Sequence, residues 1–324
     1  MTILSAIEAA ARNVYAAMQP TPQYAWPLLG RRAGCEVWVK HENHTPTGAF
    51  KVRGGLNLLA ELVAREPQFP GVISATRGNH GQSLAFAARR HGVRCLIVVP
   101  EGNSRDKNAA MRAFGADLIV HGRDFDEARE HAGSLARAEG LRFVGPFEPE
   151  LVAGVATYAL EFFRAVPDLH TVFVPIGCGS GICVLIAARD ALGLATRIVG
   201  VVAATANAYA QSFRKRERIE TATAVTVADG MAVRVPVPAA LDIIWRGAHD
   251  VVEVSDPEVE AAIRAYFDDT HQLAEGAGAA PLAALLKARD RQAKRMGIIL
   301  CGGNVDRDVY VRILEEMTWE PARV

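Results

Sequence analysis

The chain has 324 residues, half of them hydrophobic, and it carries 36 basic and 36 acidic side chains. This length allows a sizeable core, organised as two modest domains or one large one. The balanced charge excludes a global field that would favour nucleic acid or an anionic membrane, so we expect a small metabolite as partner. Five scattered cysteines without zinc or redox spacing predict reduced thiols and a cytoplasmic protein.

The N-terminal segment predicts an amphipathic helix. Ser5 and Glu8 have the spacing of a capping box, and Ile7, Val14 and Met18 would share one apolar face. This pattern differs from that of a signal peptide, and no stretch has the length and hydropathy of a membrane span.

The segments that follow predict an α/β fold. Three prolines between positions 20 and 27 indicate an extended connection, because proline interrupts helices. From residue 71 onward short apolar strands alternate with helices, a pattern typical of mainly parallel sheets covered by helices on both faces. Strands are expected at 36–39, 72–74, 95–99, 118–120, 143–144, 171–174, 197–202 and 297–300.

Helix boundaries are indicated by capping residues. Ser104 and Asp124 are placed to begin helices, and Ser255 with Glu258 forms a second capping box. The last helix is expected to end near Met317. The succession of strands and helices predicts two stacked α/β units, without a long polar linker between them.

The stretch Thr-Gly-Ala-Phe-Lys-Val-Arg-Gly-Gly at 47–55 presents Lys51 among flexible glycines. A lysine becomes a covalent catalyst when its charge is suppressed or its nitrogen is already bonded, most simply as a Schiff base with an aldehyde cofactor. The glycines at 48, 54 and 55 would let a planar ring approach the backbone. Taken alone, the stretch also fits a surface lysine at the start of a helix.

A second loop, Thr76-Arg77-Gly78-Asn79-His80, lies between a predicted strand and a predicted helix. Backbone donors at a helix N-terminus can hold an anion such as a carboxylate. Asn79 could also donate to a phenolate-like ring oxygen. The alternative is an ordinary strand-to-helix turn.

Two glycine-rich loops follow other predicted strands. The loop Gly177-Cys178-Gly179-Ser180-Gly181 has phosphate-cradle chemistry but lacks the lysine of a P-loop, so it is either a phosphate site or a plain turn. Cys301-Gly302-Gly303-Asn304 stands at the carboxyl end of a strand, the edge where open α/β sheets bind ligands. Its glycines favour close approach of a flat ligand, although a buried cysteine commonly only fills a core.

Together these segments resemble the fold-type II pyridoxal-phosphate enzymes (tryptophan synthase β-like), and within them the threonine/serine dehydratase and serine racemase group. The resemblance runs from Lys40 to Asp306. It implies that Lys51 holds the cofactor as a Schiff base, Asn79 bonds the ring O3′ and Cys301 meets the pyridine nitrogen, where a neutral thiol would favour β-elimination. The further cofactor-binding residues that it implies are Phe50, Gly177, Cys178, Gly179, Ser180, Gly181 and Glu275.

The resemblance also implies a domain arrangement and an activity. A large domain would comprise 1–70 and 150–324, a small mobile domain 71–149, and pyridoxal 5′-phosphate would lie in the cleft. The expected reaction is β-elimination from a 3-hydroxy amino acid, giving a 2-oxo acid and ammonia. Alternatives are a racemase, a β-replacement synthase, or a non-catalytic protein that binds the cofactor or an amino acid. We expect a homodimer without the C-terminal regulatory domain of allosteric threonine deaminases.

Substrate binding is expected from Thr76, Arg77, Gly78, Asn79 and His80. Ala49 replaces the serine usual in the lysine motif, and Arg77 stands where racemases carry serine and many dehydratases carry alanine. Because a guanidinium does not release its proton near neutrality, Arg77 is a poor racemisation base. It could instead pair with a second anionic group, as in 3-hydroxyaspartate, or turn outward into a salt bridge.

No metal site is expected. Metal-activated members of the group carry a glutamate after the strand that here ends at Val202, and this chain has valine at the matching place, which supplies no oxygen ligand.

Overall fold

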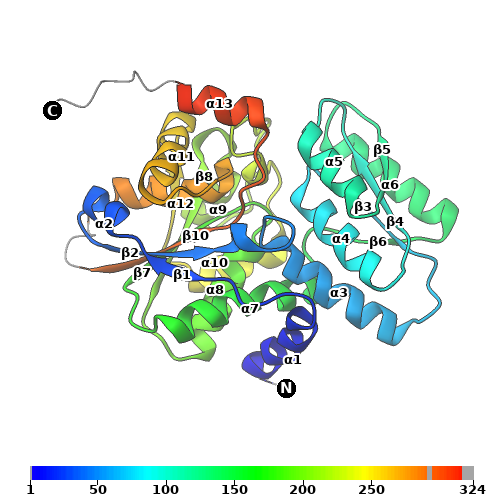
Figure 1. Cartoon of the computed structure of the whole chain (residues 1–324), viewed down its shortest axis with the longest axis horizontal. Coiled ribbons are helices and arrows are strands. Elements are labelled where there is room, and N and C mark those ends of the chain that lie inside the picture. The colour runs from blue at the N-terminus through cyan, green and yellow to red at the C-terminus, as the bar shows by residue number, and fades with distance from the viewer. Residues whose placement is uncertain (1, 290–293, 316–324) are drawn as a thin grey trace.

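The computed structural model describes residues 2–289 and 294–315, and its elements form two sheets with flanking helices (Figure 1). The larger sheet is parallel except for β1, which pairs antiparallel with β2 at one edge. Its spatial order is β1 (Gln23–Ala25), β2 (Glu36–His41), β10 (Arg295–Leu300), β7 (Thr171–Pro175), β8 (Arg197–Ala203) and β9 (Asp250–Val254).

Helices cover both faces of this sheet because its central strands are apolar on both sides. All five residues of β7 are buried, which is the pattern of a strand between two helical layers. One layer contains α2 (Pro27–Ala33), α11 (Asp256–Thr270) and α12 (Gly276–Lys287). The other contains α1 (Ile3–Tyr15), α7 (Pro149–Ala165), α8 (Ser180–Ala191) and α10 (Pro238–Gly247), with α9 (Ala208–Lys215) beside α10 and β9.

The smaller sheet is parallel throughout. Its spatial order is β5 (Asp117–Val120), β4 (Cys95–Val99), β3 (Val72–Ala75) and β6 (Arg142–Phe143). Alternate residues of β3 and β4 pack into two different apolar clusters, one under α6 (Phe125–Glu139) and one under α4 (Asn79–Arg90). Helix α5 (Arg105–Ala113) packs against α4 and β5, and α3 (Lys51–Arg65) packs against both α4 and α7.

The expected α/β fold with mainly parallel sheets is confirmed, but the N-terminal region differs in two details. Helix α1 is capped by Thr2, whose hydroxyl accepts from the Ser5 amide, so the predicted capping box at Ser5 is wrong. The proline-rich connection is not wholly extended, because Pro27 begins α2. Proline is favourable at that first position, where its missing N–H would have no partner within the helix.

The predicted strands are present, and their ends agree with the prediction to within two residues. Ser104, Asp124 and Ser255 cap their helices as predicted. The last helix, α13, spans Arg307–Glu315, and Met317 lies outside the described residues. Helix α12 was missed, because glycine and proline obscure its helical pattern in the sequence.

A largely buried charged cluster holds α3 against the larger sheet. The Arg53 guanidinium donates to Glu42 at 2.7 Å and to Glu161 at 2.6 Å, and Lys40 donates to Glu161 at 2.5 Å. Arg53, Lys40 and Glu42 have no exposed surface. Since two cations meet two carboxylates, the charge is compensated, and the helix that starts at Lys51 is fixed in position.

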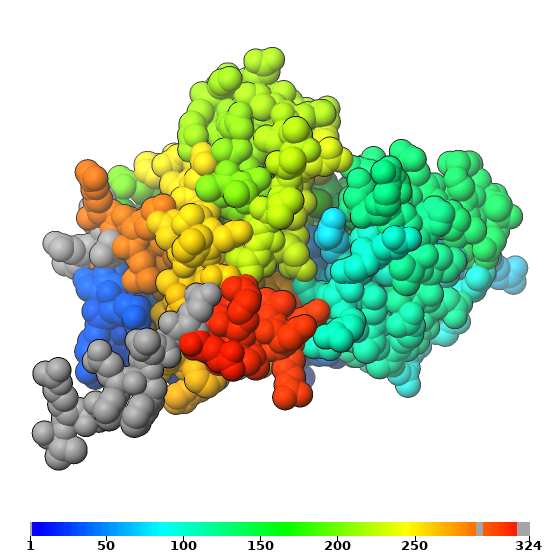
Figure 2. Space-filling model, turned by 90° about the horizontal axis from the view of Figure 1, so that it is seen from above, coloured from blue at the N-terminus to red at the C-terminus, as the bar shows by residue number. Residues whose placement is uncertain are grey.

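The smaller sheet and its helices form a lobe beside the larger one (Figures 1 and 2). Several polar contacts cross between the lobes, among them Ser104 with Asp306, Lys107 with Asp229, and Arg234 with Asp126. The red segment in Figure 2, α13, lies against the cyan lobe at this junction. The division into a fixed large domain and a mobile small one stays a prediction.

Candidate active site

A cavity of about 410 Å³ lies between the lobes. Its wall includes the loops after β3, after β7 and after β10, which are the carboxyl ends of parallel strands, as predicted from the sheet geometry. All predicted site residues line this cavity: Phe50, Lys51, Thr76, Arg77, Gly78, Asn79, His80, Gly177, Cys178, Gly179, Ser180, Gly181, Glu275 and Cys301.

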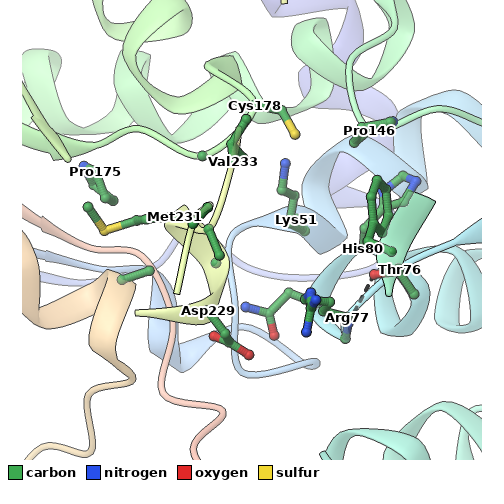
Figure 3. Close-up of a pocket in the computed structure, with 18 of the residues that line it drawn as sticks. Lys51, Thr76, Arg77, His80, Pro146, Pro175, Cys178, Asp229, Met231 and Val233 are labelled. Carbon is green, nitrogen blue, oxygen red and sulfur yellow. Dashed lines mark hydrogen bonds between the residues drawn. The ribbon is translucent and has the colours of Figure 1, made fainter. Parts of the chain in front are cut away.

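Lys51 is the first residue of α3, and its amine projects toward the glycine-rich loop (Figure 3). Its Nζ lies 3.2 Å from the Ser180 Oγ and 5.0 Å from the centre of the Phe50 ring. The Phe50 amide donates to the Cys301 carbonyl at 2.9 Å, which joins the start of α3 to the loop after β10. Burial lowers the pKa of Lys51, and this favours the neutral, nucleophilic amine.

The glycines around Lys51 have a different role from the one predicted. A Cβ on Gly54 would lie 2.8 Å from the Leu151 carbonyl, and one on Gly55 would lie 2.4 Å from the Ser83 Oγ. Both glycines therefore allow α3 to pack closely against α7 and α4. Gly48 has φ +68° and faces Asn304, so none of the three borders the cavity.

The glycine-rich loop turns sharply into α8. Gly179 has φ +95°, and a Cβ on Gly177 would lie 2.3 Å from the Gly230 carbonyl oxygen. The Tyr209 hydroxyl donates to the Cys178 carbonyl at 3.2 Å and thereby holds the loop from outside. This arrangement presents the N-terminus of α8 and the Ser180 hydroxyl to the cavity, which suits an anion such as phosphate.

Hydrogen bonds to both the nitrogen and the oxygen of its side-chain amide hold Asn79 in place. It donates to the Glu275 Oε1 at 2.7 Å, and its own oxygen accepts from Asn304 at 2.9 Å. Asn304 also donates to the Thr47 carbonyl at 2.8 Å, so it connects three of the predicted motifs. One N–H of Asn79 is left to donate to a ligand.

A second cluster, Lys107 with Asp229 and Glu275, borders the cavity. Lys107 comes from α5 and reaches Asp229 at 2.6 Å and Glu275 at 3.7 Å. Burial opposes the Lys107 charge, but the two carboxylates hold its pKa above the usual value. Burial raises the pKa of Glu275 to about 7, against the opposing effect of Lys107.

The sequence patterns did not indicate that Lys107 borders the site, or that Asn304 contacts Thr47 and Asn79. The family resemblance also covers Asp229, in Ala-Asp-Gly, but it implies no role for this residue. The one available signal for Asn304 was its place directly after Cys301-Gly302-Gly303 at a strand end.

Burial favours the neutral forms of three further groups in the cavity wall, Cys178, Cys301 and His80. Burial raises the pKa of Cys301 well above the usual range and also raises that of Cys178. Burial and the nearby Lys51 charge lower the pKa of His80 to about 3. The His80 Nε2 and the Glu275 Oε2 are buried without a hydrogen-bond partner among the described residues.

Across 2–289 and 294–315, no group of three or more His, Cys, Asp or Glu side chains is arranged to hold a metal ion. Over the same residues, no helix has the length and apolar character needed to cross a membrane.

The sequence matches the family described as pyridoxal-phosphate dependent enzyme over residues 14–302. The chain belongs to this family. It is 39% identical to the L-threonine ammonia-lyase of Geobacter sulfurreducens over 281 residues, covering 86% of this chain and 69% of that one.

Solved structures of family members also match. Threonine deaminase isoform 2 of Solanum lycopersicum superposes with a TM-score of 0.90 at 29% identity, covering 97% of this chain and 92% of that one. A pyridoxal 5′-phosphate-dependent aspartate racemase superposes with the same TM-score and identity, covering 95% and 97%.

The residues present fit the family's cofactor. The cavity offers a buried amine of lowered pKa for an aldehyde and a glycine loop at a helix N-terminus for a phosphate. Asn79 has an unused N–H, and Cys301 is a neutral thiol at the third loop. These groups come from separate parts of the chain and meet around one cavity, which matches an aldehyde, a phosphate and a ring in a single ligand.

Proposed function

We propose that this protein is a pyridoxal-phosphate-dependent ammonia-lyase that eliminates the hydroxyl group from a 3-hydroxy amino acid. The observation that carries the proposal is the position of Lys51, whose amine lies 3.2 Å from Ser180 of the glycine loop and borders the same cavity as Asn79 and Cys301. The names of its relatives, L-threonine ammonia-lyase and threonine deaminase, support this reaction class.

The overall reaction balances without an oxidant. The Cα–H and Cβ–O bonds break, the hydroxyl leaves as water, and a double bond forms between Cα and Cβ. The released enamine becomes an imine, which takes up water and gives a 2-oxo acid and ammonia. When bound, pyridoxal phosphate supplies the aldehyde that takes up the substrate amine and the ring that withdraws electrons from Cα.

The residues of this chain have distinct tasks in the proposal. Lys51 anchors the cofactor and, as a neutral amine, accepts the Cα proton. Gly177–Gly181 hold the phosphate, Asn79 donates to the ring oxygen, and Cys301 faces the ring nitrogen as a neutral thiol. Glu275 supports Asn79, and Phe50 borders the ring pocket.

Substrate orientation is assigned to the loop after β3. The Thr76 hydroxyl accepts from the Gly78 amide at 2.9 Å, so its own proton is available for the substrate carboxylate. Asn79 and His80 border the same position at the start of α4. Movement of the small lobe, with 71–149 as a domain, would exclude water from the site.

A racemase would need a second proton carrier opposite Lys51. The residue before Gly78 is Arg77, whose guanidinium stays protonated near neutrality. We therefore rank racemisation and β-replacement below elimination. The proposal also includes a cytoplasmic homodimer; the five free cysteines support a reducing compartment, and light scattering would measure the mass in solution.

The test compares the wild-type holoenzyme with Lys51→Ala. Borohydride reduction followed by peptide mapping should find the cofactor mass on the Lys51 peptide, and the variant should lack both this adduct and the visible absorbance of lysine-bound cofactor. Release of 2-oxo acid from serine, threonine and 3-hydroxyaspartate should stop in the variant. An adduct on another lysine would refute the assignment of Lys51. Formation of D-serine without oxo acid would favour a racemase.

A further inference from the structure

We propose that the active site selects a 3-hydroxy amino acid whose side chain carries a second carboxylate, and that Arg77 binds this carboxylate. The inference rests on the proposed function, because it names the substrate class for the same site. The observation that supports it is the pairing of charges in the cavity wall. Among the described residues there, every cationic side chain except Arg77 and Lys51 forms an ion pair with a carboxylate of the protein.

The first paired cation is Lys107. Its Nζ lies 2.6 Å from the Asp229 Oδ2 and 3.7 Å from the Glu275 Oε2, with 7% of its side chain exposed. The lysine therefore compensates the charge of Asp229, and burial favours the uncharged form of Glu275. Neither of those carboxylates is left to repel an incoming anion at full strength.

Charged side chains in the outer part of the cavity wall also form ion pairs. Asp126 of α6 forms an ion pair with Arg234 and another with Arg129, the latter at 3.3 Å. Asp124 accepts the amides of the first turn of α6 and so acts as its cap. Arg129 and Arg234 consequently have a carboxylate of the protein itself beside them.

Arg77 differs from these residues. It lines the cavity and is exposed, and among residues 2–289 and 294–315 it has neither an ion pair nor a side-chain hydrogen bond. The outward salt bridge considered from the sequence is not present in this part of the chain. A guanidinium offers five N–H donors in a planar fork, which matches a carboxylate in a bidentate pair.

The position of Arg77 indicates which anionic group it would bind. In Figure 3, Lys51 lies between Cys178 of the glycine loop and Arg77. Arg77 is therefore on the side opposite the proposed phosphate site. It is adjacent in sequence to Thr76, which is assigned to the α-carboxylate, so a short dicarboxylic substrate could reach both groups.

Threonine would be less suited to this environment. Its methyl group offers no partner to a charged guanidinium, and bringing the two together would remove water from the charge without replacing its hydrogen bonds. A second carboxylate at Cβ replaces those hydrogen bonds. We accordingly expect 3-hydroxyaspartate to be preferred over threonine and serine.

The kinetic test measures kcat/KM for 3-hydroxyaspartate, serine and threonine in the holoenzyme. Arg77→Ala should lower the value for 3-hydroxyaspartate by about 10- to 150-fold, the range for losing hydrogen bonds to a charged group, and should leave serine nearly unchanged. Arg77→Lys keeps the positive charge but loses the planar pair of N–H donors. Its kcat/KM for 3-hydroxyaspartate should therefore lie between those of the wild type and Arg77→Ala. Arg90→Ala removes one exposed cation from the far end of α4 and serves as the matched control.

A binding measurement gives a readout independent of turnover. Malonate should raise the thermal midpoint of the wild-type holoenzyme and of Arg90→Ala more than acetate does, and this difference should disappear in Arg77→Ala. Equal losses for all three substrates in Arg77→Ala would place Arg77 at the α-carboxylate and overturn the inference. An unchanged ratio between 3-hydroxyaspartate and serine would also overturn it, while the proposed elimination would stand. If no substrate released oxo acid, the proposed function would fail, and the malonate difference alone would decide whether Arg77 binds a second carboxylate.

Discussion

At the scale of single residues, Glu275 connects the site's chemistry to pH. Its carboxyl is 2% exposed, it accepts from Asn79, and its second oxygen has Lys107 at 3.7 Å. Burial raises its pKa to about 7, although Lys107 acts in the opposite direction. A carboxyl that titrates near neutrality and holds the asparagine assigned to the ring oxygen could make cofactor binding depend on pH.

We predict that Glu275 makes the folded apoprotein less stable as pH rises from about 5 to 8. In the unfolded chain the carboxyl has its usual pKa of 4.5, whereas in the folded protein the pKa is about 7. Between these values the folded state binds more protons, so its stability is lost as pH rises through 7. The loss should be at most about 3 kcal/mol, and Glu275→Gln should not show this component. Urea unfolding of both apoproteins at several pH values measures the difference.

Glu161→Gln is not a suitable control, because Glu161 belongs to the buried ion cluster, whereas Glu139→Gln changes an exposed carboxyl. Glu139→Gln should follow the wild-type pH profile. A stability difference between the wild type and Glu275→Gln that stays constant from pH 5 to 8 would show that Glu275 keeps an ordinary pKa.

The residues around Lys51 also show what sequence reasoning can reach. Lys51, Asn79 and Cys301 were predicted because each stands in a short glycine-containing motif, and the motifs of Asn79 and Cys301 follow strands directly. Lys107 was not predicted, because it lies inside an ordinary polar helix and meets Asp229 only through packing of the two lobes. Side chains that depend on such long-range contacts leave no local pattern.

At the scale of elements, the turn from β7 into α8 depends on backbone geometry. Gly179 is the N-cap of α8 with φ +95°, and a Cβ there would lie 2.6 Å from the Cβ of Ala240 on α10. A side chain would therefore displace either the loop or α10. Gly193, just beyond the other end of α8, also has positive φ, at +65°, but a Cβ there would meet no atom within 4 Å.

We predict that Gly179→Ala impairs cofactor binding and that Gly193→Ala does not. Both substitutions place alanine in a left-handed conformation, which costs about 1–2 kcal/mol. The collision with Ala240 is specific to Gly179 and should move the loop assigned to the phosphate. Absorbance titration of each apoprotein with pyridoxal phosphate measures affinity, and urea unfolding measures stability. Equal affinity in the two variants would contradict a phosphate role for this loop.

The elements themselves were predictable where local signals agree. The strand at 95–99 and the helix caps at Ser104 and Asp124 were placed correctly, because apolar runs and capping residues act locally. Pro27 was taken as an interruption although it begins α2. The sequence pattern of α12 gave no clear helix, since its glycines and Pro281 are accommodated by complete burial between neighbouring elements.

At the scale of the whole molecule, the two lobes meet at α3, and the buried cluster around Arg53 determines where this helix sits. Arg53 follows Lys51 by two residues and reaches Glu42 beside β2 and Glu161 on α7. The sequence suggested the fold family through its motifs, but it did not reveal this cluster. Arg53 is 11 residues from Glu42 and 108 residues from Glu161 along the chain, and these side chains become neighbours only in the packed core.

We predict that Arg53→Met destabilises the protein by about 3–5 kcal/mol, because it leaves Glu42 buried without its cation. Adding Glu42→Gln to this variant should restore part of the loss, since the carboxylate charge is then removed as well. The exposed pair of Arg94 and Glu139 provides the comparison, and Arg94→Met should cost less than about 1 kcal/mol. Urea unfolding of the four proteins measures these differences. Similar losses for Arg53→Met and Arg94→Met would mean that the buried cluster does not fix α3, and the geometry of Lys51 would then depend on the cavity loops alone.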